Sequence, residues 1–119
     1  MIKSSKTKIL FVCSRNKLRS ATAEKMYEKV QHYDVRSCGT DKSARIRITA
    51  GHIGWADWIF VMEKRHLSLI RNKYKGELQG KRIVCLNIPD EYDFMDRELV
   101  LLFQSLLSEY IDVPEIDDI

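Results

Sequence analysis

The feature that most constrains the fold lies near the start of the chain, where an apolar run leads through a polar turn into a helical pattern. The run Lys8–Val12 is typical of a buried strand, the turn occupies residues 13–19, and a helix is predicted to begin at Ser20. A buried strand that passes into a helix starts a strand–helix–strand unit. Such units build parallel sheets with helices on both faces.

The remainder of the chain repeats this alternation of strands and helices. Further strands are predicted at residues 35–38, 57–62 and 82–86, and helices at 20–31, 49–56, 63–74 and from Asp93 to Ile111. In the last helix an apolar stripe runs along one face, with Val100 at its edge: Leu99, Leu102, Phe103, Leu106, Leu107 and Tyr110. We predict one α/β domain over 1–111 with a four-stranded parallel sheet between two helix layers, and a flexible acidic tail over 112–119.

The cysteine in the turn has the surroundings of a nucleophile. Cys13 follows the strand and would face the first turn of the helix, where the helix dipole and free N–H groups favour an anion. The guanidinium of Arg19 can grip two phosphate oxygens, and the hydroxyl of Ser20 can donate to the cysteine sulfur. This arrangement suits a thiolate that attacks phosphorus and forms a phosphocysteine. The alternative is that Cys13 is a small core residue at a strand end.

The spacing of these residues resembles the phosphate-binding loop of the low-molecular-weight protein tyrosine phosphatases, C-x-x-N-x-x-R-S. The resemblance implies that Cys13 is the nucleophile, that Asn16 braces the loop, that Arg19 binds phosphate and that Ser20 stabilises the thiolate. It also implies the strand order 2-1-3-4. A second family pattern, D-x-I-x-x-M-D/E, is matched from Asp57 to Glu63. The other predicted phosphate-binding positions of the loop are Ser14, Arg15, Lys17 and Leu18.

Phosphocysteine chemistry needs an acid for the leaving oxygen and a base for water. The candidate is Asp90 in Ile88-Pro-Asp-Glu-Tyr92, because ligands of parallel sheets bind at the carboxyl ends of strands. The family reads Asp-Pro-Tyr here, which implies that Asp90 is the general acid and that Tyr92 lines the pocket; Glu91 takes the place of the proline. Asp93 is a rival that we assign to helix capping. Alternatively, Asp90 is a surface turn residue after Pro89.

Other reactive side chains are predicted to be structural. His66 is interpreted as a packing or surface residue and His52 as part of a short helix, while Cys38 and Cys85 are interpreted as core residues on strands. The chain is short between Cys38 and Thr49, where the family carries an aromatic specificity loop and a histidine that joins the network of the phosphate loop. We find no counterpart of that histidine in the sequence.

Composition bounds the compartment and the partners. The chain has 119 residues, and three cysteines without a close pair predict neither a disulfide framework nor a zinc site. No apolar run or leader pattern predicts membrane insertion or secretion, so we expect a cytoplasmic protein. The last eight residues hold four acidic side chains; the others carry 20 basic and 13 acidic ones, an excess of 7 positive charges. Such a body suits anionic substrates and leaves contact with nucleic acid open.

The sequence therefore predicts a cysteine-dependent phosphomonoesterase, in the first place a protein tyrosine phosphatase, that needs neither metal nor cofactor. Arg15 and Lys17 are expected to favour substrates with extra negative charge, such as acidic phosphopeptides or nucleotide phosphates. One alternative is arsenate reduction, which needs further cysteines placed for a disulfide cascade. Another is a phosphate- or nucleic-acid-binding module without catalysis, supported by Glu91 in place of proline.

Overall fold

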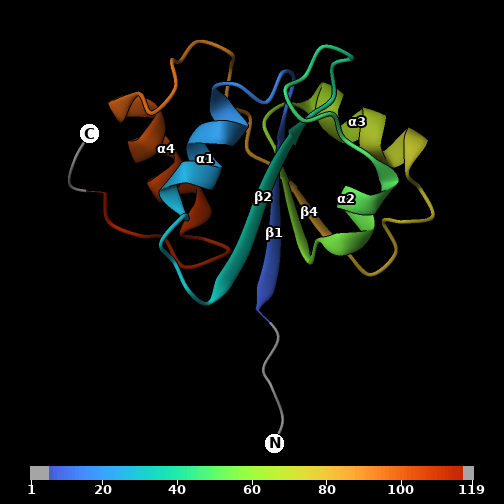
Figure 1. The fold of residues 1–119 in the computed structure, drawn as a ribbon, viewed down its shortest axis with the longest axis horizontal. Coiled ribbons are helices and arrows are strands. Elements are labelled where there is room, and N and C mark those ends of the chain that lie inside the picture. The colour runs from blue at the N-terminus through green and yellow to red at the C-terminus, as the bar shows by residue number, and fades with distance from the viewer. Residues whose placement is uncertain (1–5, 117–119) are drawn as a thin grey trace, which may run out of the picture.

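The computed structural model describes residues 6–116, which form a central parallel sheet with helices on both faces (Figure 1). The strand order is β2-β1-β3-β4 and all neighbours run parallel, so the predicted fold is confirmed. In chain order, the elements are β1 Thr7–Cys13, α1 Arg19–Met26, β2 Tyr33–Gly39, α2 Ala50–Trp55, β3 Trp58–Val61, α3 Lys64–Lys73, β4 Arg82–Cys85 and α4 Arg97–Leu107.

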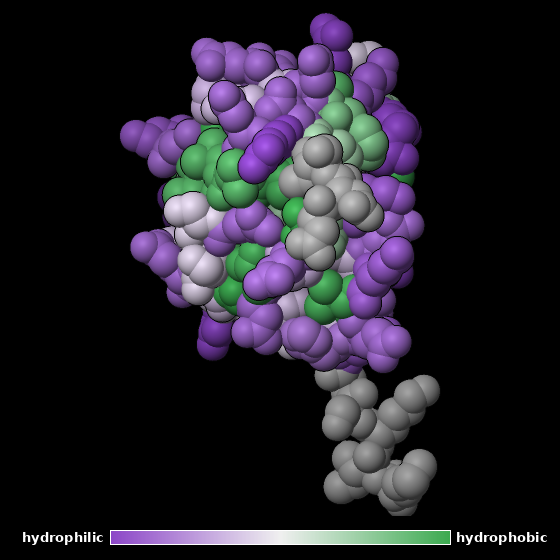
Figure 2. Space-filling model, turned by 90° about the vertical axis from the view of Figure 1, so that its left-hand side faces the viewer, coloured by the Kyte–Doolittle hydropathy of each residue, from purple (hydrophilic) through white to green (hydrophobic). Residues whose placement is uncertain are grey.

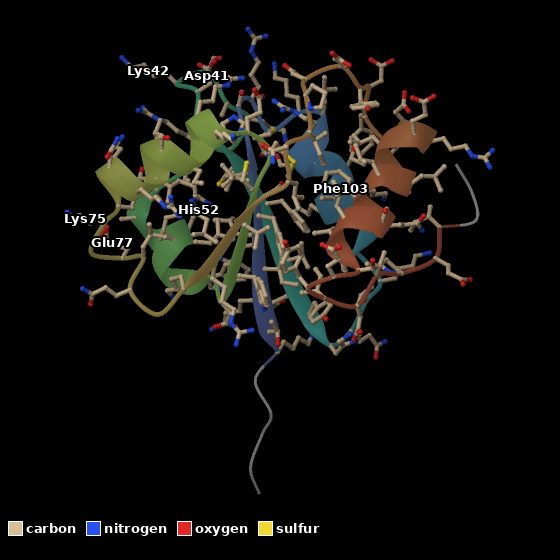
Figure 3. The ribbon with its side chains drawn as sticks, turned by 180° about the vertical axis from the view of Figure 1, so that it is seen from behind. Asp41, Lys42, His52, Lys75, Glu77 and Phe103 are labelled. Atoms are coloured by element: carbon tan, nitrogen blue, oxygen red, sulfur yellow. The ribbon has the colours of Figure 1, made fainter. Side chains whose placement is uncertain are left out.

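Two apolar cores lie on the two faces of the sheet. α1 and α4 cover one face, where Phe11 packs against Phe60 and Phe103 with ring centroids 5.6 and 6.1 Å apart; Phe103 points from α4 toward the sheet (Figure 3). α2 and α3 cover the other face, where Leu10 and Ile70 are buried. Successive residues of a strand point to opposite faces of the sheet, and helices cover both faces. The strands nearest the centre are therefore apolar without interruption.

The first helix ends earlier than predicted. α1 stops at Met26 rather than near residue 31, and Tyr27 follows as a buried residue at the helix end. The cause is strand pairing: Tyr33 already pairs with Thr7 in β2, so the chain must leave the helix and turn before that point. The period of the apolar residues alone could not show this, because tertiary pairing overrides local helical preference.

The start of α4 corrects a prediction. Asp96, not Asp93, is the N-cap, and its Oδ1 accepts the N–H of Glu98 at 2.8 Å. The apolar stripe is also rotated: Val100 is fully buried rather than at the edge, while Tyr110 lies beyond the helix and is 41% exposed. The ring of Tyr110 instead packs edge-on against Trp58, with centroids 5.9 Å apart.

The predicted cap of α2 is confirmed. The Thr49 hydroxyl accepts the N–H of His52, and His52 Nδ1 accepts the N–H of Thr49. The preceding segment Asp41–Ile48 is not a strand: it turns at residues 41–44 and then makes an isolated bridge between Gly39 and Arg47.

The predicted tail begins with residues that contact the body of the protein. The carbonyl of Asp112 accepts the hydroxyl of Tyr27 at 2.8 Å, and the carbonyl of Pro114 accepts the amide of Gln104 at 3.0 Å. Residues 117–119 lie outside the described residues, so flexibility of 112–119 stays a prediction.

The surface is mixed in character. On the face seen in Figure 2, hydrophobic residues form separate patches among hydrophilic ones. Among the described helices, none has the length and hydropathy needed to cross a bilayer.

Candidate active site

The carboxyl ends of the four strands meet at the upper edge of the sheet in Figure 1, and the loop 13–18 between β1 and α1 lies there. β2 ends beside it at Gly39. A Cβ added at Gly39 would meet the carbonyl oxygen of Ser14 at 2.5 Å and the Cβ of Ala44 at 2.8 Å. Glycine is therefore needed at this position for close approach, because the atoms it faces are largely backbone.

Four successive carbonyls of the loop are held from outside by the connection after β2. The N–H groups of Thr40, Asp41 and Arg45 donate to the carbonyls of residues 13, 14 and 15, and Arg45 Nε donates to the carbonyl of Asn16 at 3.0 Å. The C=O and N–H of one peptide group point in opposite directions, so the N–H groups of residues 14–17 face the inside of the loop. Inward N–H groups of this kind bind anions.

A chain of hydrogen-bonded side chains leads to Cys13. Ser37 Oγ donates to Glu24 Oε1 at 2.5 Å and accepts from Asn16 Nδ2 at 2.8 Å; the same Nδ2 donates to Ser20 Oγ at 2.8 Å. Asn16 has a φ of 58°, which asparagine tolerates better than most residues. Asn16 is thus tied to both α1 and β2. Ser37 was missed because it lies in another element, and Glu24, in α1, was missed because its contact runs through Ser37.

The sulfur of Cys13 is the point on which these contacts converge. Cys13 is 3% exposed; its Sγ lies 3.0 Å from Ser20 Oγ and accepts the N–H of Asn16 at 3.3 Å. The hydroxyl of Ser20 accepts from Asn16 Nδ2 and has one proton of its own, for which the sulfur of Cys13 at 3.0 Å and the carbonyl of Cys38 at 3.4 Å are the two neighbours. When the sulfur is a thiolate, the hydroxyl must be the donor of the contact to it.

Arg19 is buried and held in one orientation. Its side chain is 1% exposed, and its Nη1 donates to Glu63 Oε2 and to the carbonyl of Ile88, both at 2.6 Å. Hydrogen bonds from Arg65 and Arg19 lower the pKa of Glu63 to about 2. Glu63 is thus a fixed negative charge that aims the guanidinium of Arg19, a role beyond its place in the strand pattern.

The loop and the segment after β4 enclose a cavity of about 170 Å³. Asp90 belongs to its wall, and the Asp90 Oδ1 lies 3.7 Å from Arg19 Nε. The carboxylate of Asp90 is 56% exposed, so it can reach a ligand in the cavity. Tyr92, predicted to line the pocket, packs half-buried against the core under α1 and α4 instead. The cavity is lined by Cys13, Arg15, Lys17, Leu18, Arg19 and Asp90.

His66 is buried, in agreement with the packing alternative of the prediction, but it also makes a contact that the sequence did not predict. It is 1% exposed, and its Nδ1 accepts the N–H of Glu63 at 3.0 Å, while its Nε2 lies 3.0 Å from Ser14 Oγ. Burial, with Arg19 and Arg65 nearby, lowers its pKa to about 4. A histidine therefore does contact the phosphate loop, from α3 rather than from the connection after β2. His52 has no such contact and serves the cap of α2.

The other two cysteines face the opposite side of the sheet from Cys13. Cys38 faces the core under α2 and α3, whereas Cys13 faces the opposite core, and Cys85 packs against the same side as Cys38. All three are free thiols, and burial raises the pKa of Cys38. The structure thus places no second thiol beside Cys13 for a disulfide cascade. Within residues 6–116, no three His, Cys, Asp or Glu side chains are grouped as metal ligands would be.

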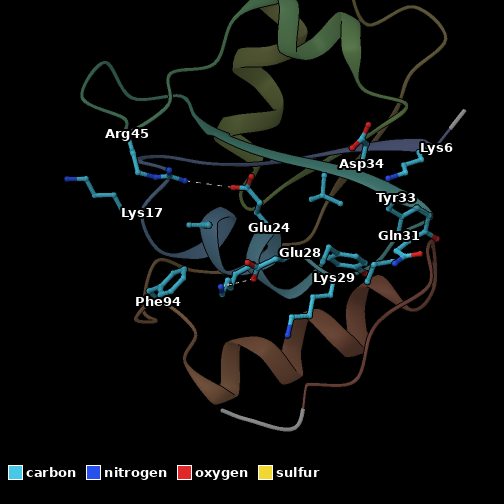
Figure 4. Close-up of a pocket in the computed structure, with 15 residues that line it drawn as sticks. Lys6, Lys17, Glu24, Glu28, Lys29, Gln31, Tyr33, Asp34, Arg45 and Phe94 are labelled. Carbon is cyan, nitrogen blue, oxygen red and sulfur yellow. Dashed lines mark ion pairs between the residues drawn. The ribbon is translucent and has the colours of Figure 1, made fainter.

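A larger open groove of about 1030 Å³ runs along α1 (Figure 4). Its wall includes Glu24 and Arg45, an ion pair with 3.8 Å between the charged atoms, and the exposed ring of Phe94. Neither Cys13 nor Arg19 lines this groove, so it is not the reaction site. Lys17 lines both the groove and the cavity, so the two hollows adjoin.

Comparison with curated sequences gives a partial match. No family model matches the chain. Peptide chain release factor 3 of Lactobacillus gasseri and of Lactobacillus johnsonii is 36% identical over 62 residues, which cover 52% of this chain and 11% of the release factor. The chain thus spans about a tenth of the length of these curated relatives.

Comparison with solved structures gives matches over most of the chain. The protein is similar to SP-PTP, a low molecular weight protein tyrosine phosphatase from Streptococcus pyogenes, with TM-score 0.70, 16% identity, and coverage of 89% of this chain and 94% of the other. For the tyrosine phosphatase Wzb from Escherichia coli K30, the TM-score is 0.69 at 21% identity, and the match covers 89% of this chain and 96% of Wzb. For the YwlE arginine phosphatase from Geobacillus stearothermophilus, the TM-score is 0.63 at 18% identity, and the match covers 91% of this chain and 99% of YwlE. Over about nine-tenths of its length, the chain has the fold of the low-molecular-weight protein tyrosine phosphatases.

Proposed function

We propose that this chain is a cysteine-dependent phosphomonoesterase that acts through a phosphocysteine. The observation that carries the proposal is the sulfur of Cys13, which accepts the N–H of Asn16 and lies 3.0 Å from the hydroxyl of Ser20, at a cavity that Arg19 and Asp90 also line. A solved relative supports the covalent step: a cysteine-to-serine mutant of the YwlE arginine phosphatase carries a phosphorylated active-site serine.

In the proposed reaction each of these groups has a role. The thiolate of Cys13 attacks phosphorus, the S–P bond forms and the ester P–O bond breaks, while Asp90 gives a proton to the leaving oxygen. Arg19 and the inward N–H groups of the loop stabilise the charge of the equatorial oxygens without a metal. Water then attacks the phosphocysteine, with Asp90 taking its proton. The S–P bond breaks and Cys13 leaves as thiolate, so phosphate is released and the enzyme is restored.

The substrate is proposed to be phosphotyrosine on a protein in the first place, with a preference for substrates that carry a second negative charge. The cavity wall supports the preference. Arg15 and Lys17 line it, no aromatic side chain does, and neither cation has a carboxylate within ion-pair distance among the described residues. The same charges would repel the guanidinium leaving group of phosphoarginine.

Three phenyl phosphates with para substituents can test this preference: carboxymethyl, methyl and aminomethyl. With wild type, we expect kcat/KM to fall in that order, and the spread to shrink at high salt. In the double variant R15Q/K17Q, the ratio of kcat/KM between the carboxymethyl and the aminomethyl substrate should be about tenfold smaller than in wild type, since each charge contributes on the order of 0.5–1 kcal/mol. The control K75Q, in the loop after α3, should leave it unchanged. Equal values for the three substrates with wild type would remove the proposed preference.

The test of the reaction itself is hydrolysis of p-nitrophenyl phosphate without added metal, between about pH 4.5 and 8. Wild type should turn over, C13S should be inactive, and D90A should lose at least about a hundredfold in kcat. A folded wild type that binds vanadate without turnover would instead indicate a phosphate-binding module. Arsenate turnover with a thiol reductant and no phosphatase activity would indicate a reductase.

We also propose that the enzyme works in the cytoplasm, where its three free cysteines stay reduced.

A further inference from the structure

The first turn of α3 and the residue before it contact both ends of the phosphate loop. Glu63, directly before α3, holds Arg19 at the end of the loop, as described above. At the start of the loop, Ser14 Oγ is 3.0 Å from His66 Nε2 and accepts Arg65 Nη2 at 2.8 Å. Arg65 is fixed in turn by Glu63, with Nε and Nη2 at 3.3 and 3.1 Å from the two carboxylate oxygens. The contacts to Ser14 have no part in the proposed chemistry.

The hydrogen-bond partners determine which nitrogen of His66 carries the proton. The backbone N–H of Glu63 can only donate, so His66 Nδ1 is an acceptor and has no proton. In the neutral ring the proton is therefore on Nε2, which donates to Ser14 Oγ. Arg65 also donates to this oxygen, so the hydroxyl of Ser14 has both of its acceptor positions filled.

This proton count excludes another interpretation of the pair. A serine beside a histidine can be a nucleophile with its general base. Here the histidine donates to the serine and cannot accept its proton at Nε2. The pair is therefore a fixed structural contact and not a second catalytic dyad.

We propose that His66, in its neutral form with the proton on Nε2, is a positioning residue that fixes the phosphate loop through Ser14. The inference rests on the proposed function, because the loop that is fixed is the one that would hold the substrate phosphate. The chain of contacts is short: Ser14 directly follows Cys13, so a shift of the Ser14 side chain moves the backbone that carries the nucleophile. His66 is almost completely buried, which leaves it little freedom to take another rotamer.

Burial, and after it the surrounding charges, keep His66 neutral. Arg19 from α1 and Arg65 from α3 oppose its protonation, while Glu63 before α3 and Asp90 from the segment after β4 favour it; burial adds to the opposition. A second proton would have to sit on Nδ1, where it would face the N–H of Glu63. Protonation would therefore break the contact on the α3 side and loosen the loop.

The chain offers a matched control for this histidine. His52 occupies the corresponding position in α2, where its Nδ1 accepts the N–H of Thr49, but it does not contact the loop. H66L and H52L thus both lose a helix cap of the same kind, and only H66L loses the contact to Ser14. In H66Q the side-chain oxygen can accept the N–H of Glu63 while the nitrogen donates to Ser14.

The experiment measures kcat/KM for p-nitrophenyl phosphate and the Kd for vanadate in H66L, H66Q, H52L, S14A and the double variant H66L/S14A. In H66L and in S14A, we expect kcat/KM to fall about tenfold and the Kd for vanadate to rise about tenfold, which is the effect of one well-placed hydrogen bond. H66Q should retain most of the wild-type values, and H52L should keep them despite a similar loss of thermal stability. The double variant should have the same kcat/KM and vanadate Kd as the more impaired of the two single variants, because His66 acts through Ser14.

Two results would overturn the proposal. One is wild-type kcat/KM and vanadate affinity in S14A, which is small enough to keep the fold. The other is a double variant whose losses multiply, since that would mean that the two residues act independently. The vanadate measurement separates this inference from the proposed function: if wild type binds vanadate and hydrolyses nothing, the phosphatase proposal fails while the effect of His66 on the loop is still measured.

Discussion

Replacing Glu63 by glutamine is expected to destabilise the folded protein by about 3 kcal/mol, and a bound oxyanion is expected to restore part of that loss. The variant removes the negative charge that pairs with Arg19 at 2.6 Å and leaves a guanidinium that is 1% exposed. Two unit charges about 4 Å apart at an effective dielectric constant of about 20 attract by about 4 kcal/mol. The carboxylate of Glu63 is 30% exposed and the amide keeps a neutral hydrogen bond, so a smaller loss than the full attraction is expected.

The pKa of Glu63 gives the same magnitude by a different route. Hydrogen bonds from Arg65 and Arg19 together lower the value from 4.5 to about 2, so the folded state binds the proton less readily than the unfolded state. At about 1.4 kcal/mol per pKa unit, this corresponds to about 3 kcal/mol of stability. The sign follows: this contribution is present above pH 4.5 and is lost as the pH falls through about 2.

Urea denaturation at neutral pH measures the difference between wild type and E63Q. The control E77Q changes an exposed carboxylate in the loop after α3, away from Asp41 in the connection after β2 (Figure 3). Its free energy of unfolding should stay within about 0.5 kcal/mol of wild type. Saturating phosphate or vanadate should narrow the gap between E63Q and wild type, because the bound anion supplies the charge that Arg19 lacks. A loss in E63Q no larger than that in E77Q, or a gap that the anion leaves unchanged, would refute this account of Arg19.

The remaining predictions concern the backbone beside the loop and the buried histidine. G39A should lose about 1–3 kcal/mol of stability and most of the activity, because the new Cβ meets the Ser14 carbonyl at 2.5 Å; G54A, in helix α2 with nothing within 4 Å, should be neutral or slightly stabilising, as thermal denaturation of the two can show. For His66, stability should fall as the pH drops from 6.5 toward about 4, because the unfolded chain takes up a proton there that the folded chain resists. The slope of unfolding free energy against pH should be smaller in H66L by about one proton, and an unchanged slope would contradict the buried neutral histidine.

The sequence by itself determined the order of elements and pointed to the loop that we propose as the reaction site. Strand and helix patterns depend on residues close together in the chain, so the alternation that requires a parallel sheet could be predicted, as could the cap at Thr49. The loop is likewise local: Cys13, Asn16, Arg19 and Ser20 lie within one turn of the chain, and their spacing alone indicates an anion-binding nucleophile.

Only the tertiary structure decided which distant side chains complete that loop. Glu63 is 44 residues from Arg19, and His66 is 52 residues from Ser14, so no local pattern could pair them. Boundaries were decided in the same way: α1 ends at Met26 because the chain must turn before β2 begins at Tyr33, and Tyr110 lies beyond the end of α4, where its ring packs against Trp58. The physical reason is that burial and charge pairing depend on the elements that pack against a residue, and a single strand or helix carries no information about its neighbours.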